Sequence, residues 1–239
     1  MRLLLLAPPG GGKGTQGERL AARYGVRHIA AGDLLRAEAQ AYTPAGREIA
    51  IYQARGDLVP DQIVLDALTP AVVEAAASGG YILDGFPRTL PQASAAAELA
   101  ARLGVTLDAV VYLYAPEEVL TQRLLGRASQ GGRADDVADV IRHRLRVFAE
   151  TTGPLVPYYT ERGILVAVDA DQPPDSVTAD IQDRLTGLRL TSFDIMPTNY
   201  IVMPTTDIGT TMHAVRMTIH AVRMTSHEVG QIPVSLTLL

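Results

Sequence analysis

Short apolar segments alternate with helix-patterned segments along residues 1–187 of this 239-residue chain. Strands are predicted at 2–7, 81–84, 109–114 and 164–168. Nearly continuous apolar strands separated by helices are typical of parallel βα units, because such strands are buried only when helices cover both faces of their sheet. The sequence therefore predicts an α/β fold of three layers with a central parallel sheet. In such folds, ligands bind beyond the carboxyl ends of the strands.

The segments between these strands are predicted to be mainly helical. Apolar residues at helical spacing predict helices at 13–24, 33–41, 45–55, 61–78, 91–103, 116–125, 135–151, 154–161 and 176–185. Pro70 is expected to bend or break the fourth of these helices, because proline lacks the N–H that an internal helical position donates. A glycine-rich loop is predicted at 126–132.

Composition and charge exclude several classes of protein. The chain has no cysteine, which excludes a disulfide scaffold and a cysteine-ligated zinc site. Its net charge of −5 is a poor match for a nucleic-acid binder. The first apolar run, Leu3–Ala7, is shorter than the apolar core of a secretory signal, and no stretch reaches the length of a membrane span. We therefore expect a cytoplasmic protein whose partners are neither nucleic acid nor a membrane.

A glycine-rich segment joins the first predicted strand to the first predicted helix. Its glycines let successive backbone N–H groups point at one anion, and the helix N-terminus adds a partial positive charge. The ammonium of Lys13, the only lysine in the chain, can reach nucleotide phosphates, and the Thr15 hydroxyl can bind Mg²⁺. A flexible glycine turn is the alternative, but the flanking strand and helix favour phosphate binding. The predicted loop comprises Gly10, Gly11, Gly12, Lys13, Gly14 and Thr15.

An acidic residue, Asp84, ends the predicted strand 81–84. A carboxylate at a strand end beside a phosphate loop can hold Mg²⁺ directly or through water. The dipeptide Asp84-Gly85 by itself would favour a turn or a cap, but the phosphate loop favours the metal role. The sequence therefore predicts a Mg²⁺ site formed by Thr15 and Asp84.

Several arginines gather in the second half of the chain. Arg123 and Arg127 are four residues apart and share a helix face, and Arg127 and Arg133 bracket a glycine-rich stretch. Arg144 follows on the next predicted helix. Guanidinium groups bind phosphate oxygens bidentately, and phosphoryl transfer between phosphates needs such clamps rather than an acid–base residue. Each arginine alone would suggest a solvated helix charge, but as a set they indicate a closing lid.

Six segments taken in order resemble those of adenylate kinases over about residues 1–187: APPGGGKGT, HIAAGDLLR, GDLVPD, LDGFPRTLPQ, RLLGR and GRADD. The ending GKGT is similar to that of nucleoside monophosphate kinases. The resemblance implies a P-loop fold with an AMP-binding helical insert at about 30–59 and a short lid at about 126–135 that holds no zinc. It also implies a monomer that uses Mg²⁺ and transfers the terminal phosphoryl group of ATP to AMP, giving two ADP.

The resemblance also implies roles for individual residues. The residues implied for ATP are Gly10, Gly11, Gly12, Lys13, Gly14, Thr15, Arg127 and Gln172. Those implied for AMP are Ala31, Arg36, Asp57, Leu58, Val59, Gly85, Phe86, Pro87, Arg88, Gln92, Arg133 and Arg144. Those implied for the transfer itself are Lys13, Arg88, Arg123, Arg133 and Arg144.

Two departures from the family pattern leave alternatives open. Ala31 stands where adenylate kinases usually carry threonine, and alanine there is similar to UMP/CMP kinases. A lost hydroxyl removes one hydrogen bond, which would soften the preference for AMP about tenfold. Ala7 stands where the general phosphate-loop motif begins with glycine. Together with the unusual C-terminal segment, Ala7 motivates a third hypothesis, a nucleotide-binding module with impaired catalysis.

Residues 188–239 differ in character from the preceding chain. They contain five of the six methionines, and the hexapeptide HAVRMT occurs twice, at 213–218 and 220–225. His213, His220 and His227 recur every seven residues, a spacing that lacks the i, i+3 or i+4 pattern of helical metal ligands. A short duplication therefore explains the repeat better than a metal site. We expect an atypical extension that can lack ordered structure and that activity does not require.

Overall fold

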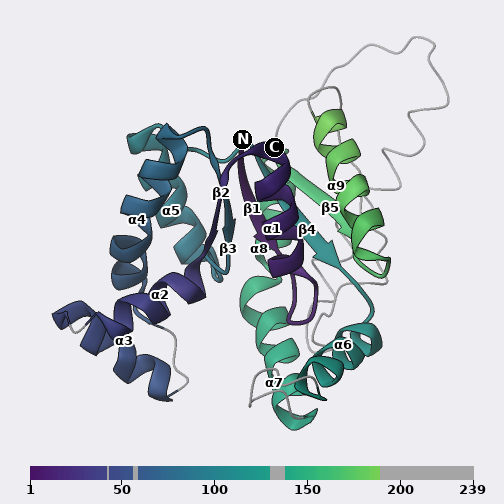
Figure 1. Ribbon diagram of the computed structural model, residues 1–239, viewed down its shortest axis with the longest axis horizontal. Coiled ribbons are helices and arrows are strands. Elements are labelled where there is room, and N and C mark those ends of the chain that lie inside the picture. The colour runs from purple at the N-terminus through teal and green to yellow at the C-terminus, as the bar shows by residue number, and fades with distance from the viewer. Residues whose placement is uncertain (42, 56–58, 130–137, 189–239) are drawn as a thin grey trace, which may run out of the picture. The chain divides into compact units, whose positions relative to one another are not determined.

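A computed structural model describes residues 1–41, 43–55, 59–129 and 138–188. Its central feature is a five-stranded sheet in the order β2-β3-β1-β4-β5, with all neighbouring strands parallel (Figure 1). The strands are β1 (Arg2–Leu6), β2 (Arg27–Ala30), β3 (Tyr81–Asp84), β4 (Ala109–Tyr114) and β5 (Leu165–Asp169). The predicted α/β class with a central parallel sheet is therefore confirmed.

Strand β2 has no counterpart among the predicted strands. It has four residues, begins with Arg27 and His28, and buries only Ile29 fully. As an edge strand it pairs with β3 alone, where Ala30 lies opposite Asp84. A short, half-polar edge strand lacks the apolar run that marks the inner strands, and only pairing with β3 defines it.

Helices occupy most of the other described residues and match the predicted segments closely. They are α1 (Lys13–Tyr24), α2 (Ala31–Gln40), α3 (Pro44–Arg55), α4 (Asp61–Ala77), α5 (Leu90–Leu103), α6 (Glu117–Ser129), α7 (Ala138–Val147), the π-helical turn η1 (Phe148–Thr152), α8 (Leu155–Thr160) and α9 (Pro174–Leu188). Each of these helices is too short or too polar to cross a membrane.

Two details of the local predictions are wrong, namely a break at Pro70 and the start of the loop at 126–132. The alternative expectation, a bend at Pro70, stays a prediction. Pro70 lies inside α4, which continues unbroken because Val64, Leu68 and Ala75 on either side of it are buried against the core. Burial of a helix face outweighs the loss of one hydrogen bond. The loop predicted at 126–132 begins later than expected, because α6 runs to Ser129. Its remaining part, 130–132, lies outside the described residues.

Alternate residues of the inner strands face two separate layers of core. Leu3 and Leu5 pack with side chains of α1, α6, α7 and α9 on one face of the sheet. Leu4 and Leu6 pack with side chains of α2, α3, α4, α5 and α8 on the other face. This arrangement explains why the inner strands are apolar at every position and not only at alternate ones. It also leaves the loops at the carboxyl ends of the strands free to form a site.

Two buried tyrosines should make the fold sensitive to alkali. Burial raises the pKa of Tyr81 and of Tyr112 to about 12, and for Tyr81 this outweighs the lowering effect of Arg2. Because each folded pKa lies above the unfolded value, the neutral phenols stabilise the fold below pH 10, and this contribution is lost as the pH rises toward 12. We expect the free energy of unfolding, measured in urea, to fall by about 1 kcal/mol per tyrosine between pH 10 and 11.

The variant Tyr112→Phe provides the comparison for this prediction. It removes one of the buried phenols, so its free energy of unfolding should depend less steeply on pH above 10. An unchanged slope in the variant would contradict the assignment to Tyr112.

Candidate active site

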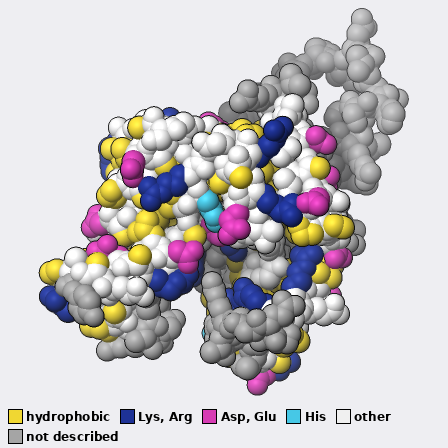
Figure 2. All heavy atoms as spheres, in the orientation of Figure 1, with side chains coloured by type: hydrophobic (Ala, Val, Ile, Leu, Met, Phe, Trp, Pro, Cys, Tyr) yellow, Lys and Arg dark blue, Asp and Glu magenta, His cyan; other side chains and the backbone are white. Residues whose placement is uncertain are grey.

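A cleft of about 770 Å³ lies at the carboxyl ends of the strands. The loop between β1 and α1 lines it, together with residues from α2, from the segment after β3, and from α6, α7 and η1. Figure 2 shows Lys and Arg side chains gathered beside the hollow in the lower half of the face in view. Since these elements are far apart in sequence, only the fold brings their basic side chains to one cleft.

The glycine-rich loop is shaped to hold an anion. Gly10 and Gly12 both have positive φ, 83° and 85°, and a Cβ at Gly10 would lie 2.8 Å from the Leu120 carbonyl oxygen. Gly12 is the N-cap of α1 and supplies no side-chain hydrogen bond, and the first turn of this helix has no acidic residue. The N-terminal amides of α1 therefore face the cleft without a competing side-chain acceptor.

Lys13 and Ala7 fit this loop closely. The Lys13 ammonium donates a hydrogen bond of 2.7 Å to the Ala7 carbonyl oxygen, which folds the side chain back over the loop. The Ala7 methyl group is buried, and a Cβ at Gly11 would approach it to 2.7 Å. Ala7 therefore fills the space beneath the loop, and the Gly11 N–H still closes the turn on the Pro8 carbonyl at 3.0 Å.

Arg88 is held in place by several hydrogen bonds. Its Nε donates to the Gly85 carbonyl at 2.9 Å. Its backbone N–H donates to the Gln92 side chain at 2.7 Å, and its carbonyl accepts from the Thr152 hydroxyl at 2.9 Å. These contacts place the guanidinium in the cleft together with that of Arg36, which forms an ion pair with Asp33 on the same helix. Each of these guanidinium groups can bind a phosphate bidentately.

Helices α6 and α7 contribute the other described arginines of the cleft. Arg123 donates a hydrogen bond of 2.7 Å to the carbonyl of Ala170, the residue that follows β5. Arg127 and Arg144 also line the cleft, the first near the end of α6 and the second in the last turn of α7. Arg133 lies outside the described residues. Arg123, Arg127 and Arg144 therefore line the same cleft as the phosphate loop, while their role in a closing lid stays a prediction.

Thr15 and Asp84 are the predicted metal ligands, and both line the cleft. The last residue pair of the β1–β3 ladder is Leu5 with Asp84, so the carboxylate lies beside the start of the phosphate loop. The described residues contain no group of three or more acidic, histidine or cysteine side chains able to hold a metal by themselves. A hydroxyl and a carboxylate are oxygen donors that suit Mg²⁺ completed by water and phosphate oxygens.

Not every predicted site residue lines the cleft. Gly85 and Pro87 do, whereas the predicted residues that do not are Ala31, Val59, Phe86, Gln92 and Gln172. The Gln92 amide is buried and donates to Asp61 at 2.7 Å, and the Gln172 amide donates to the Asp169 carbonyl at 3.0 Å. The nucleotide contacts predicted for these residues stay predictions. Asp57 and Leu58 lie outside the described residues.

Several residues of the cleft were missed by the sequence analysis, among them His28, Thr151 and Thr152. His28 lies on the unpredicted strand β2, two residues before Ala30, so the alternation of a strand places both on the same side. Thr151 follows Arg144 by seven residues, a helical spacing that puts both on one face. The helical spacing could have identified Thr151 within the predicted helix 135–151, whereas His28 lies on a strand that no sequence pattern marked.

Comparison with known proteins gives a consistent result. The family model described as adenylate kinase matches residues 5–164, more than half of the chain. An adenylate kinase of Synechococcus sp. (strain JA-2-3B'a(2-13)) is 45% identical over 192 residues, which are 80% of this chain and 99% of that relative. The adenylate kinase of Xanthomonas euvesicatoria pv. vesicatoria (strain 85-10) is 45% identical over 77% of this chain and 99% of its own length. The adenylate kinase of Stenotrophomonas maltophilia (strain R551-3) is 43% identical over 78% of this chain and 100% of its own length.

Proposed function

The chain belongs to the adenylate kinase family, and we propose that it catalyses the reversible transfer of the terminal phosphoryl group of ATP to AMP, giving two ADP. One observation supports this most directly. A phosphate loop carrying Lys13 and a separate pair of arginines, Arg36 and Arg88, line the same cleft. Two phosphate-binding groups in one cleft suit a reaction in which one phosphorylated nucleotide attacks another.

Different residues of the cleft have different roles in such a transfer. The loop amides and Lys13 hold the phosphates of ATP, and Arg36 and Arg88 hold the phosphate of AMP. Arg123, Arg127 and Arg144 neutralise charge on the group in transit. The attacking phosphate oxygen is already ionised near neutral pH, so no general base is needed. Alignment of the two nucleotides and stabilisation of the charge on the transferred phosphoryl group therefore account for the rate of transfer.

Mg²⁺ is the cofactor that we propose, held by Thr15 and, directly or through water, by Asp84. Bound there, it would neutralise charge on the ATP phosphates. Asp84→Asn keeps the size of the side chain but removes the charge. We expect kcat to fall about a hundredfold and the Mg²⁺ concentration for half-maximal rate to rise. Steady-state rates over a Mg²⁺ titration measure both, and an unchanged Mg²⁺ requirement would contradict the role of Asp84.

The choice of AMP is tested by comparing turnover of AMP, UMP and CMP with ATP as donor. Ala31 is buried, and its methyl would lie 3.7 Å from a Cβ placed on Gly85, one of the predicted AMP residues that line the cleft. We expect AMP to be preferred, and Ala31→Thr to sharpen the preference by up to about tenfold. A clear preference for UMP or CMP would overturn the proposal.

We assign the activity to residues 1–187, with residues 188–239 as an extension. The relatives named above are covered almost completely by alignments of 185–192 residues. The described part of the chain ends with α9 at Leu188, after the last buried side chain of that helix, Leu185. Within the domain, we propose that the insert at about 30–59 binds AMP and that the segment at about 126–135 closes as a lid.

Truncation after Leu188 tests this division of the chain. We expect kcat and both KM values of the truncated protein to stay within about twofold of the full chain, because all proposed site residues precede the cut. A circular dichroism spectrum would verify folding. A large fall in kcat in a folded truncated protein would show that the extension contributes to activity.

We further propose that the enzyme is a cytoplasmic monomer. The proposed site residues that line the cleft all belong to one chain, the arrangement expected of an enzyme that is active as a monomer. Sedimentation velocity of the full chain would test this, and a stable dimer at micromolar concentration would contradict it.

A further inference from the structure

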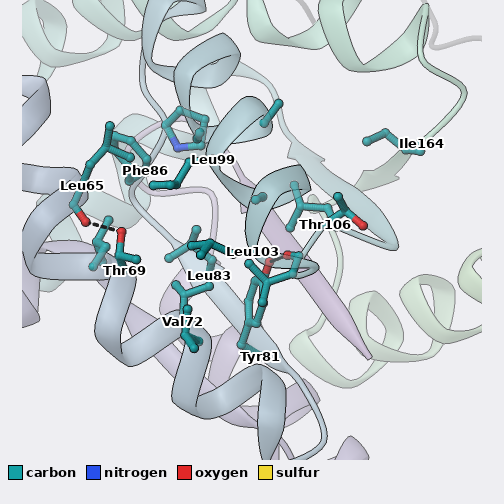
Figure 3. Close-up of a pocket in the computed structure, with 18 of the residues that line it drawn as sticks. Leu65, Thr69, Val72, Tyr81, Leu83, Phe86, Leu99, Leu103, Thr106 and Ile164 are labelled. Atoms are coloured by element: carbon teal, nitrogen blue, oxygen red, sulfur yellow. Dashed lines mark hydrogen bonds between the residues drawn. The ribbon is translucent and has the colours of Figure 1, made fainter.

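A second cavity, of about 200 Å³, lies between α4, α5, β3 and the end of α8. Figure 3 shows its walls: Leu65 and Val72 from α4, Leu99 and Leu103 from α5, and Tyr81 and Leu83 from β3. None of the cleft residues except Pro87 lines it. The cavity therefore adjoins the proposed nucleotide site at Phe86 and Pro87, two of the predicted AMP residues, and its other walls are separate from that site.

The composition of α5 explains why this space exists. Its wall-forming residues include Ala96, Ala97 and Ala100, whose short side chains face the larger residues of α4. Close packing of a protein interior would require larger side chains at some of these positions. The alanines therefore leave a gap between α4 and α5.

The walls of this cavity offer almost nothing to a polar ligand. The Tyr81 hydroxyl, which reaches the cavity, already donates to the Val105 carbonyl at 2.7 Å. The Thr69 hydroxyl donates to the Leu65 carbonyl at 2.6 Å, as the dashed line in Figure 3 marks. The remaining lining residues are mainly aliphatic and aromatic. Only an apolar group gains free energy by entering.

One cation, Arg162, lies on the exposed side of this apolar space. Its guanidinium stacks 3.4 Å from the centroid of the Tyr158 ring, and it donates a hydrogen bond of 2.9 Å to the Tyr158 carbonyl. Tyr158 also lines the cavity. Among the described residues, no acidic side chain forms an ion pair with Arg162. Stacking holds the guanidinium in one orientation, with N–H groups left to bind an anion.

From this arrangement we propose that the cavity binds a small amphipathic monocarboxylate, with its apolar body between α4 and α5 and its carboxylate on Arg162. A cavity of about 150 Å³ holds a benzene-sized molecule, so this one suits an apolar body of about seven to nine carbons. The ligand is thus a medium-chain or aryl-alkyl carboxylate. No bond is made or broken in this site.

Calorimetric titration of the full chain with octanoate tests the proposal. We expect saturable binding with a dissociation constant below about 1 mM, and about tenfold weaker binding of 1-octanol, which has the same apolar body without the charge. Arg162→Gln should weaken octanoate binding about tenfold and leave octanol binding unchanged. Arg102→Gln is the matched control, because Arg102 is exposed on α5 but does not line the cavity.

Filling the cavity tests the position of the apolar body. Ala96→Leu should weaken binding of octanoate and octanol alike by at least about tenfold, while ATP and AMP kinetics remain unchanged. If thermal unfolding shows that leucine disrupts the fold, Ala100→Val makes the same test with a smaller addition.

Four results of the binding experiments would overturn the proposal. The first is a lack of saturation at octanoate concentrations about tenfold above the expected dissociation constant. The second is an equal loss of octanoate affinity in the Arg162 and Arg102 variants, and the third is unchanged affinity in the folded cavity-filling variant. The fourth is displacement of octanoate by saturating ADP. The last result would place the carboxylate in the nucleotide cleft. Dimerisation that the cavity-filling variant abolishes would identify a second copy of the chain as the occupant, which would equally reject the carboxylate.

Discussion

Replacing Lys13 with Met should lower kcat about a thousandfold, the largest effect expected of any single substitution in this enzyme. The ammonium lies over the phosphate loop, held by the Ala7 carbonyl at 2.7 Å, and it lines the cleft with Asp84 and the arginines. It is a compact charge on a flexible stem, so it can follow the phosphoryl group as charge develops. No other lysine exists in the chain to replace it.

Steady-state rates with ATP and AMP, together with calorimetric binding of ADP, measure this effect. We expect ADP to bind the variant within about tenfold of the wild-type affinity, because the loop amides and the helix N-terminus remain. Lys13→Arg should recover only part of kcat, since the planar guanidinium cannot occupy the same position. A variant with nearly normal kcat would show that Lys13 is not in the catalytic machinery. Turnover that does not depend on Lys13 would also leave the hypothesis of a nucleotide-binding module with impaired catalysis in place.

Replacing Arg88 with Met should lower kcat/KM for AMP by about a hundredfold to a thousandfold. Three hydrogen bonds, to Gly85, Gln92 and Thr152, position this residue before any nucleotide binds. A positioned guanidinium loses little entropy on binding a phosphate, so its removal costs more than the loss of an ordinary surface charge. The loss should appear chiefly in kcat/KM for AMP, and the KM for ATP should change by less than about threefold.

Arg102→Met is the matched control for Arg88. Arg102 is exposed in the last turn of α5 and lines neither cavity, so its loss should change kcat/KM by less than about twofold. Equal losses in both variants would point to the net charge of the protein rather than to a specific phosphate contact. A loss confined to the KM for ATP would reassign Arg88 to the other nucleotide.

Local sequence pattern predicted much of this fold because its signals are local. The bounds of α1, β3 and β4 agree with the predictions, since an apolar run or a glycine marks each of their ends. The continuation of α6 to Ser129 was missed because a glycine within a helix costs only about 1 kcal/mol, which favourable packing outweighs. The edge strand β2 was missed because its only defining contact is with a strand some fifty residues away.

The sequence by itself determined the class of the fold, the phosphate loop and the family, because each depends on residue types at short, fixed spacings. Only the tertiary structure decided which of these residues meet. Arg123 binds the carbonyl of Ala170, Thr152 binds that of Arg88, and Gln92 binds Asp61, each across a separation that no periodicity encodes. The cavity beside Arg162 is likewise a property of packing, because the short side chains of α5 leave a gap only where α4 lies opposite them.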